Sequence, residues 1–245
     1  MSYLIIGASS GLGKDLTYEF ARNNKNLIIC SRDLRDLKAL KFDLETKFKV
    51  NVHIIQIDLA LIEKVKKKIN FSKKPFFNIK GVLFPAGEMN SEDCIGLDYQ
   101  KINNLLSSNF SSITYLITNY IKYKKRGLIV GYGSVSAQIG RKVNPFYSAS
   151  KRALESFFES LMFQYGNKNY NIQFYVLGYL KTNLSFGKKL FLPRGSTIKL
   201  SKLVYKNRFL KNKKIYFPSW WILIIFVIKL LPLKFFMLVN NFFNK

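Results

Sequence analysis

The chain has 245 residues, of which 48% are hydrophobic, so it can bury one sizeable core and is not a globally disordered chain. Its formal net charge is +26, and no Asp or Glu follows Glu159. This distribution favours an anionic partner such as a phosphorylated ligand, lipid headgroups or nucleic acid. Two cysteines, Cys30 and Cys94, are too few for a disulfide framework. Together with the absence of a basic, apolar leader before the first apolar run, they predict a cytoplasmic protein.

The single histidine gives little support to metal or Ser-His-Asp chemistry. His53 lies within the apolar run from Val52 to Ile57, where a strand residue is the simplest interpretation. We therefore expect no metal site.

Short apolar runs alternate with longer amphipathic segments along the chain. The runs predict strands over Tyr3–Ile6, Leu27–Cys30, Val52–Ile57, Gly81–Phe84, Leu128–Tyr132 and Ile172–Leu177. The segments predict helices over Leu12–Asn23, Leu34–Lys49, Ala60–Ile69, Tyr99–Tyr123 and Tyr147–Tyr165, the fourth of them interrupted near Ser107–Ser108. This alternation predicts an α/β fold with a Rossmann-like, doubly wound parallel sheet in three α/β/α layers, and a ligand site at the carboxyl ends of the strands.

The first predicted strand leads into a glycine-rich segment that opens a helix. Its sequence is Gly7-Ala8-Ser9-Ser10-Gly11-Leu12-Gly13, with the spacing Gly-x3-Gly-x-Gly. Glycine permits a tight turn and lets the backbone approach a pyrophosphate at the helix N-terminus. A plain tight turn is the alternative interpretation.

Further along, Tyr147 and Lys151 lie four residues apart at the start of a predicted helix. This spacing places both side chains on one face, one turn apart. A nearby ammonium favours phenolate and lowers a tyrosine pKa from its usual value of about 10, which suits the phenol to proton transfer with an alcohol or ketone. A surface pair is the alternative, and the glycine segment argues against it.

With these two motifs, the sequence resembles the short-chain dehydrogenase/reductase family, single-domain branch, over residues 3 to 183. The matching positions, in chain order, are Gly7, Gly11, Gly13, Asp58, Asn109, Ser134, Tyr147, Lys151, Gly178 and Thr182. Three stretches depart from the family pattern. Phe84-Pro85-Ala86-Gly87 replaces Asn-Asn-Ala-Gly, Gly133 precedes Ser134 where the family has a second serine, and Leu177 replaces a proline.

The resemblance implies hydride transfer between a nicotinamide and a carbonyl carbon. Tyr147 is then the proton donor or acceptor, and Lys151 binds the nicotinamide ribose and biases the tyrosine. Ser134 hydrogen-bonds the substrate oxygen, and Asn109 holds a relay water. The implied cofactor contacts are Gly7, Ser9, Ser10, Gly11, Leu12, Gly13, Asp58, Ala86, Gly87, Tyr147, Lys151, Gly178 and Thr182. Asp58 is expected at the adenine ring.

The residues that follow the second predicted strand, Ser31-Arg32-Asp33, indicate whether NAD or NADP is preferred. A carboxylate on the ribose 2′-hydroxyl favours NAD, whereas a guanidinium favours the 2′-phosphate of NADP. Ser31 occupies the acid position of NAD-preferring relatives, Arg32 the arginine position of NADP-preferring ones, and Asp33 is expected to cap the next helix. The sequence therefore predicts NADP(H) over NAD(H).

The carboxyl-terminal segment differs in character from the rest. We expect residues 1–185 to form the NADP-binding catalytic domain. Residues 186–218 are expected to form a loop and helix region of the same domain at the substrate cleft, with a loop from Gly187 to Gly195, and residues 219–245 to form a basic, apolar helical tail. Trp220 and Trp221 precede an apolar run to Ile228 that is too short for a simple membrane span. An interfacial anchor on an anionic membrane is predicted, with a lipid-linked or other small-molecule carbonyl substrate. A helix that covers the substrate pocket or forms a dimer interface is the alternative, and the family resemblance implies a homo-oligomer.

Three other functions are compatible with parts of this pattern. An extended-branch relative that modifies nucleotide sugars would keep Tyr-x3-Lys, but it has the spacing Gly-x2-Gly-x2-Gly and a larger carboxyl-terminal domain. A non-catalytic NADP sensor or scaffold would be expected to lack Tyr147 or Lys151. A nucleic-acid binder is suggested by charge alone, so we expect no nucleic-acid partner.

Overall fold

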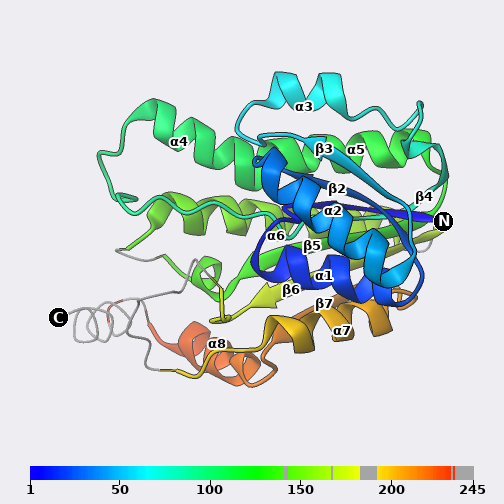
Figure 1. Cartoon of the computed structure of the whole chain (residues 1–245). Helices are drawn as coiled ribbons and strands as arrows, with labels where there is room; N and C mark the ends of the chain where they lie inside the picture. Colours follow the sequence, from blue (N-terminus) through cyan, green and yellow to red (C-terminus); the bar gives the residue numbers. More distant parts are fainter. Residues whose placement is uncertain (141–142, 167, 183–191, 233, 235–245) are drawn as a thin grey trace.

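The computed structural model describes residues 1–140, 143–166, 168–182, 192–232 and 234 (Figure 1). Its strands form one sheet in the order β3-β2-β1-β4-β5-β6-β7, and every pairing between neighbours is parallel. The strands are β1 (Ser2–Ile6), β2 (Asn26–Ser31), β3 (Val52–Gln56), β4 (Ile79–Leu83), β5 (Gly127–Ser134), β6 (Tyr170–Leu177) and β7 (Lys213–Phe217). The winding direction reverses between β1 and β4, and such a switch point opens a crevice at the carboxyl ends of the strands.

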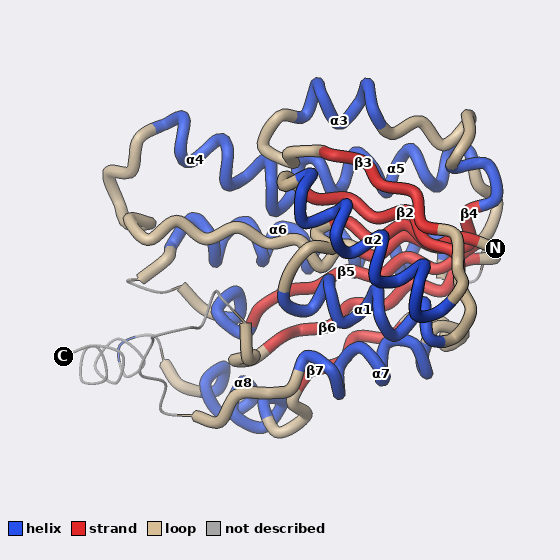
Figure 2. The backbone as a smooth tube through the Cα atoms, in the orientation of Figure 1, coloured by secondary structure: helices blue, strands red, loops and turns tan. Residues whose placement is uncertain are grey.

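Helices cover both faces of this sheet (Figure 2). They are α1 (Gly11–Arg22), α2 (Leu34–Phe48), α3 (Ile62–Lys68), α4 (Tyr99–Leu106), α5 (Ser112–Tyr123), α6 (Pro145–Tyr165), α7 (Thr197–Asn207) and α8 (Trp221–Leu230). One buried cluster joins the sheet to α1, α2 and α7, and a second joins it to α3, α5 and α6. The predicted three-layer, doubly wound α/β fold is confirmed.

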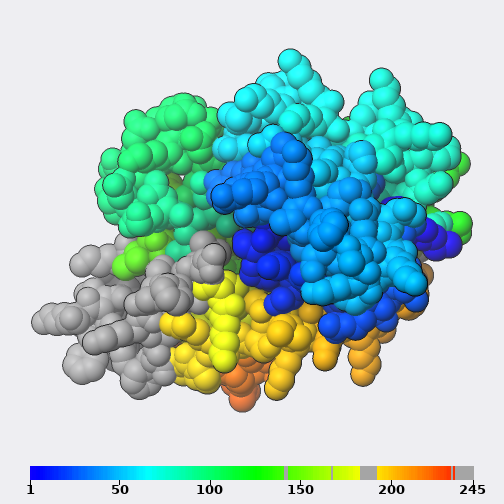
Figure 3. All heavy atoms as spheres, in the orientation of Figure 1, coloured from blue at the N-terminus to red at the C-terminus, as the bar shows by residue number. Residues whose placement is uncertain are grey.

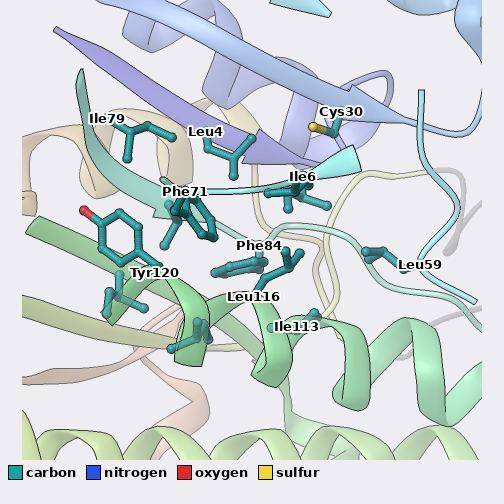
Figure 4. Packing of buried hydrophobic residues seen from close by; sticks show 14 of the residues in the cluster. Leu4, Ile6, Cys30, Leu59, Phe71, Ile79, Phe84, Ile113, Leu116 and Tyr120 are labelled. Carbon is teal, nitrogen blue, oxygen red and sulfur yellow. The ribbon is translucent and has the colours of Figure 1, made fainter. Parts of the chain in front are cut away.

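Buried aromatic and aliphatic side chains fill the second cluster (Figure 4). Phe71 lies edge-on to Tyr120 of α5 with 5.4 Å between the ring centroids, and Leu4 and Phe84 come from the sheet side of the same cluster. Since β1 and β4 are central strands, their side chains are buried on both faces, which explains why they read as continuous apolar runs.

Each strand and helix predicted up to Leu177 is present, with its ends shifted by at most two residues, and α8 lies within the expected helical tail. The interruption expected near Ser107–Ser108 is a π-helical turn, Ser107–Ser111, so α4 and α5 form one continuous helical segment. Beyond residue 195, α7 lies in the region expected to contain loop and helix, whereas the edge strand β7 was not predicted. Most of the expected Gly187–Gly195 loop, and the tail after Lys234, lie outside the described residues.

Candidate active site

A cavity of about 720 Å³ opens at the carboxyl edge of the sheet. Its volume is within the range of small-molecule and cofactor sites. Residues from the loops that follow six successive strands line it, and they include all but one of the predicted site residues: Gly7, Ser9, Ser10, Gly11, Leu12, Gly13, Arg32, Asp58, Ala86, Gly87, Ser134, Tyr147, Lys151, Gly178 and Thr182. The exception is Asn109, which is fully buried behind the cavity wall.

The glycine segment forms a close-packed turn between β1 and α1. Gly7 has φ +93°, and a Cβ there would lie 2.7 Å from Ala86 Cα. A Cβ on Gly13 would lie 1.8 Å from the Gly7 carbonyl oxygen. The Ser10 side chain makes no capping hydrogen bond to the first turn of α1. The first N–H groups of α1 are therefore available to an anion, and the glycines let it approach.

Tyr147 and Lys151 both face the cavity from the first turns of α6. The Lys151 side chain is buried, with Nζ 3.3 Å from the Tyr132 carbonyl oxygen and 3.5 Å from that of Ala86. Nζ lies 6.0 Å from the centroid of the Tyr147 ring. Burial lowers the pKa of Lys151 to about 8, so the ammonium form still predominates at pH 7.

A residue from outside α6 caps the helix that carries Tyr147. The Asp93 carboxylate is buried and accepts hydrogen bonds from the backbone N–H groups of Phe146 at 3.0 Å and Tyr147 at 2.8 Å. Asn144, at the N-cap position, has φ +57° and makes no side-chain capping bond. Asp93 therefore satisfies the first turn of α6 and fixes the start of the helix against the loop that follows β4.

Ser134 and Asn109 occupy different surroundings. Ser134 ends β5, and its hydroxyl lies 2.8 Å from the hydroxyl of Ser136. Asn109 lies in the π-helical turn, where its side chain bonds both main-chain groups of Glu88 at 2.8 Å and donates to the Ser150 hydroxyl at 3.2 Å. The amide of Asn109 therefore holds the loop after β4.

At the end of the cavity away from Tyr147, Arg32 extends from the end of β2. Its guanidinium is exposed and forms an ion pair with Glu88, with Nη1 3.4 Å from Oε1. The Asp33 carboxylate accepts from the N–H groups of Arg35 and Asp36, so its predicted capping role is confirmed. Asp58 lines the cavity and accepts from the N–H of Ala60 at 3.0 Å.

The segment after β6 closes the cavity above the glycine turn. A Cβ on Gly11 would lie 3.3 Å from Thr182 Cγ2. A Cβ on Gly178 would lie only 1.7 Å from Nε1 of Trp221 in α8. Glycine at position 178 thus makes room for the Trp221 indole, which also lies edge-on to Tyr179, with 5.5 Å between ring centroids.

Sequence reasoning did not identify Glu88, Asp93, Ser108 or Ser136 as site residues, and it named Trp221 without predicting its contact with Gly178. Asp93 precedes the helix that it caps by more than fifty residues, and the ion pair between Glu88 and Arg32 joins two different loops. Neither relationship has a local sequence pattern. Glu88 could have been noted because it directly follows the Ala86-Gly87 match.

Comparison with protein families matches residues 2–189 to the short chain dehydrogenase model. The chain belongs to the short-chain dehydrogenase family. A 3-oxoacyl-[acyl-carrier-protein] reductase of Buchnera aphidicola is 30% identical over 188 residues, which cover 74% of each chain. A hydroxysteroid 11-beta-dehydrogenase 1-like protein of Xenopus laevis is 26% identical over 230 residues, covering 89% of this chain and 78% of the relative.

Solved structures show the same fold. A short-chain dehydrogenase from Sphingobium yanoikuyae in complex with NADPH superposes with a TM-score of 0.76, at 23% identity over 89% of this chain and 87% of that one. Together with the family match, the names of the relatives show that the chain is an NAD(P)-dependent oxidoreductase of the short-chain dehydrogenase/reductase type. Among the residues described, no helix has the length and apolar content needed to cross a bilayer.

Proposed function

We propose that the chain interconverts a carbonyl and a secondary alcohol with NADP(H), and that Tyr147 transfers the proton. The observation that carries this proposal is the single cavity that Tyr147 and Lys151 share with the glycine turn. The turn offers N–H groups at the start of α1, while α6 offers an acid–base pair at the other end of the same crevice. A dinucleotide bound along the crevice would join the two ends.

The residues present fit such a cofactor. A Cβ at Gly7 or Gly13 would collide with the neighbouring backbone, and the backbone of this turn is thereby open to a pyrophosphate. In this proposal Gly7, Ser9, Ser10, Gly11, Leu12 and Gly13 hold the phosphates, and Ala86 and Gly87 line the middle of the cofactor. Asp58 contacts the adenine, and Gly178 and Thr182 contact the nicotinamide end. The bound nicotinamide supplies the hydride chemistry.

The chain's own groups handle the proton. Tyr147 donates its hydroxyl proton to the carbonyl oxygen during reduction and takes it back during oxidation. The Lys151 ammonium, one turn away, stabilises the phenolate and binds the nicotinamide ribose. Ser134 donates a hydrogen bond to the substrate oxygen, where negative charge develops. The helical turn that contains Asn109 holds a relay water through a main-chain carbonyl.

The preference for NADP(H) rests on Arg32. Its guanidinium lies at the end of β2, where a ribose 2′-substituent would be, and the preceding residue, Ser31, has no carboxylate of its own. A bidentate arginine–phosphate contact is among the stronger charged hydrogen bonds.

The proposal is tested by Tyr147→Phe. We expect this variant to lose about 10²- to 10⁴-fold in turnover, the range for one general acid–base group, while NADPH affinity changes little. The control is Tyr179→Phe, which removes the hydroxyl of another tyrosine that lines the cavity. Substrates are screened by NADPH oxidation with 3-oxoacyl thioesters and steroid ketones, the compounds that the names of the relatives indicate. Wild-type turnover in Tyr147→Phe on any substrate so found would overturn the assignment.

For the carboxyl-terminal tail we propose attachment to the cytoplasmic face of an anionic membrane, with a lipid-linked or other membrane-proximal substrate. Support comes from α8, whose exposed side chains include Ile222, Leu223, Phe226, Val227 and Leu230. The acid-free residues 192–232 lie on the side of the molecule opposite α3 (Figure 3). Trp221 packs against Gly178 at the cavity, so such a surface would lie beside the substrate end. We also propose a homo-oligomer, whose interface is the alternative role for α8.

A further inference from the structure

The Glu88 carboxylate lies inside the cavity and has two side-chain partners. Ser108 donates its hydroxyl hydrogen to Oε2 at 2.8 Å, and Oε1 lies 3.4 Å from Nη1 of Arg32. All three residues line the cavity. An acid thus holds the guanidinium that the proposed function assigns to the cofactor's 2′-phosphate.

The ion pair crosses the crevice. Arg32 follows β2 and Glu88 follows β4, and these two strands flank β1 in the sheet. The glycine turn follows β1 at the same edge, so the bridge from Arg32 to Glu88 passes over that turn. A dinucleotide laid from Asp58 to Tyr147 along the cavity would run through this position.

The ion pair between Arg32 and Glu88 can break without disturbing the surrounding fold. The Arg32 and Glu88 side chains are 66% and 36% exposed, and a pair with that much solvent access contributes little to folding. The backbone of Glu88 is fixed independently, because the Asn109 amide bonds its N–H and its carbonyl. Loss of the ion pair therefore frees a carboxylate and a guanidinium while the loop stays in place.

We propose that Glu88 determines cofactor specificity: its carboxylate is the resident counter-ion of Arg32, is exchanged for the phosphate of NADPH, and opposes that phosphate once it is bound. The inference rests on the proposed function. A phosphate on Arg32 lies within a few ångströms of the Glu88 carboxylate, and like charges at that distance repel even in partly aqueous surroundings. NADH has a hydroxyl at this position and meets much less repulsion. Glu88 thus reduces the NADPH preference that Arg32 creates.

The test is Glu88→Gln in the full chain, with NADPH and NADH titrated by nicotinamide fluorescence. This change keeps the shape and a hydrogen-bond acceptor for Ser108 and removes only the charge. We expect the Kd for NADPH to fall about three- to tenfold, and that for NADH by less than about twofold. The difference should shrink as salt is raised. Arg32→Ala should weaken NADPH more than NADH.

The matched control is Glu92→Gln. Glu92 lies on the same loop, pairs with Lys101 on α4 and does not line the cavity. It gives the same change in net charge, so we expect both dissociation constants to remain unchanged. Thermal denaturation of both variants verifies the fold.

Two outcomes would overturn the inference while leaving the proposed function intact. One is an unchanged ratio of NADPH to NADH affinity in Glu88→Gln. The other is weaker NADH binding in that variant, which would make Glu88 a ribose-hydroxyl acceptor. If the folded wild-type protein bound neither dinucleotide, the proposed function itself would fail, and the inference with it.

Discussion

The region up to Thr182 and the region from residue 192 to residue 232 contribute to the site in different ways. Every residue that lines the cavity comes from the first region, among the residues described. The second region acts through contact: β7 pairs with β6, and Trp221 packs against Gly178. Both contacts bear on the segment from Leu177 to Thr182, which closes the cavity. The first region thus supplies the lining of the cavity, and the second contacts one wall.

The same division separates what the sequence could predict from what it could not. The glycine turn and the Tyr147–Lys151 spacing are set by local backbone geometry, so the pattern alone placed them at the strand and helix ends where they are found. The edge strand β7 begins with two lysines, one of which, Lys214, pairs with Glu155 and Glu159 of α6. Only three apolar residues, Ile215 to Phe217, follow these lysines, so the local pattern is too short to predict the strand.

Within the first region, the missed residues are also tertiary. Asp93 caps a helix far along the chain, and Glu88 reaches Arg32 across the loop after β1. In both cases a residue on the loop after β4 is held by an element distant in sequence. Local patterns therefore predicted which groups reach the cavity, but not which groups hold them there.

Of the predictions that compare the two regions, the one with the largest expected effect tests the glycine turn of the first region. Gly13→Ala adds a Cβ that would lie 1.8 Å from the Gly7 carbonyl oxygen. Relieving that overlap costs about 1–3 kcal/mol and displaces the turn, so we expect NADPH affinity to fall by about tenfold to a hundredfold. Isothermal titration measures it. Gly140→Ala is the control, because a Cβ there meets nothing within 4 Å. Equal affinities in the two variants would show that the turn does not hold the cofactor.

The second prediction concerns the charge of Lys151. Burial lowers its pKa to about 8, and an anionic dinucleotide binds the protonated form better. NADPH affinity should therefore be constant below pH 8 and fall above it, by at most about tenfold per pH unit. In the unfolded chain the pKa of Lys151 returns to its usual value of about 10, so the unfolded state binds this proton more tightly than the folded state. The free energy of unfolding should therefore rise between pH 8 and about 10. Fluorescence titrations from pH 6 to 10 check the first point. A decline of the same form in Lys151→Met would assign it to another group.

The third prediction compares the loss of a helix cap at the candidate site with the loss of a helix cap outside it. Asp93 and Asp98 each accept two backbone N–H bonds at a helix start, on α6 and α4 respectively. Replacing either with Ala should lower the free energy of unfolding by about 1–2 kcal/mol. Only Asp93→Ala should also reduce turnover, by about five- to tenfold, since it loosens the turn that carries Tyr147. Urea unfolding and initial rates distinguish these effects. Equal turnover in the two variants would reduce Asp93 to a structural cap.

The smallest expected effect tests the second region and its exposed helix. Phe226 of α8 and Phe163 of α6 are 62% and 92% exposed, so replacing either with Ser should leave the fold intact. If α8 inserts into a bilayer interface, Phe226→Ser loses part of the burial energy of one phenyl ring. Binding to vesicles of phosphatidylcholine and phosphatidylglycerol should then weaken about threefold, while Phe163→Ser binds like the wild type. Co-sedimentation across a salt series separates the two contributions, because attraction of the acid-free segment to the lipid fades with salt and the difference due to Phe226 does not. The prediction would be contradicted if the wild type and both variants failed to bind vesicles and Phe226→Ser changed the oligomeric mass. In that case α8 forms a subunit interface, and the second region holds its wall of the cavity through protein contacts instead of lipid.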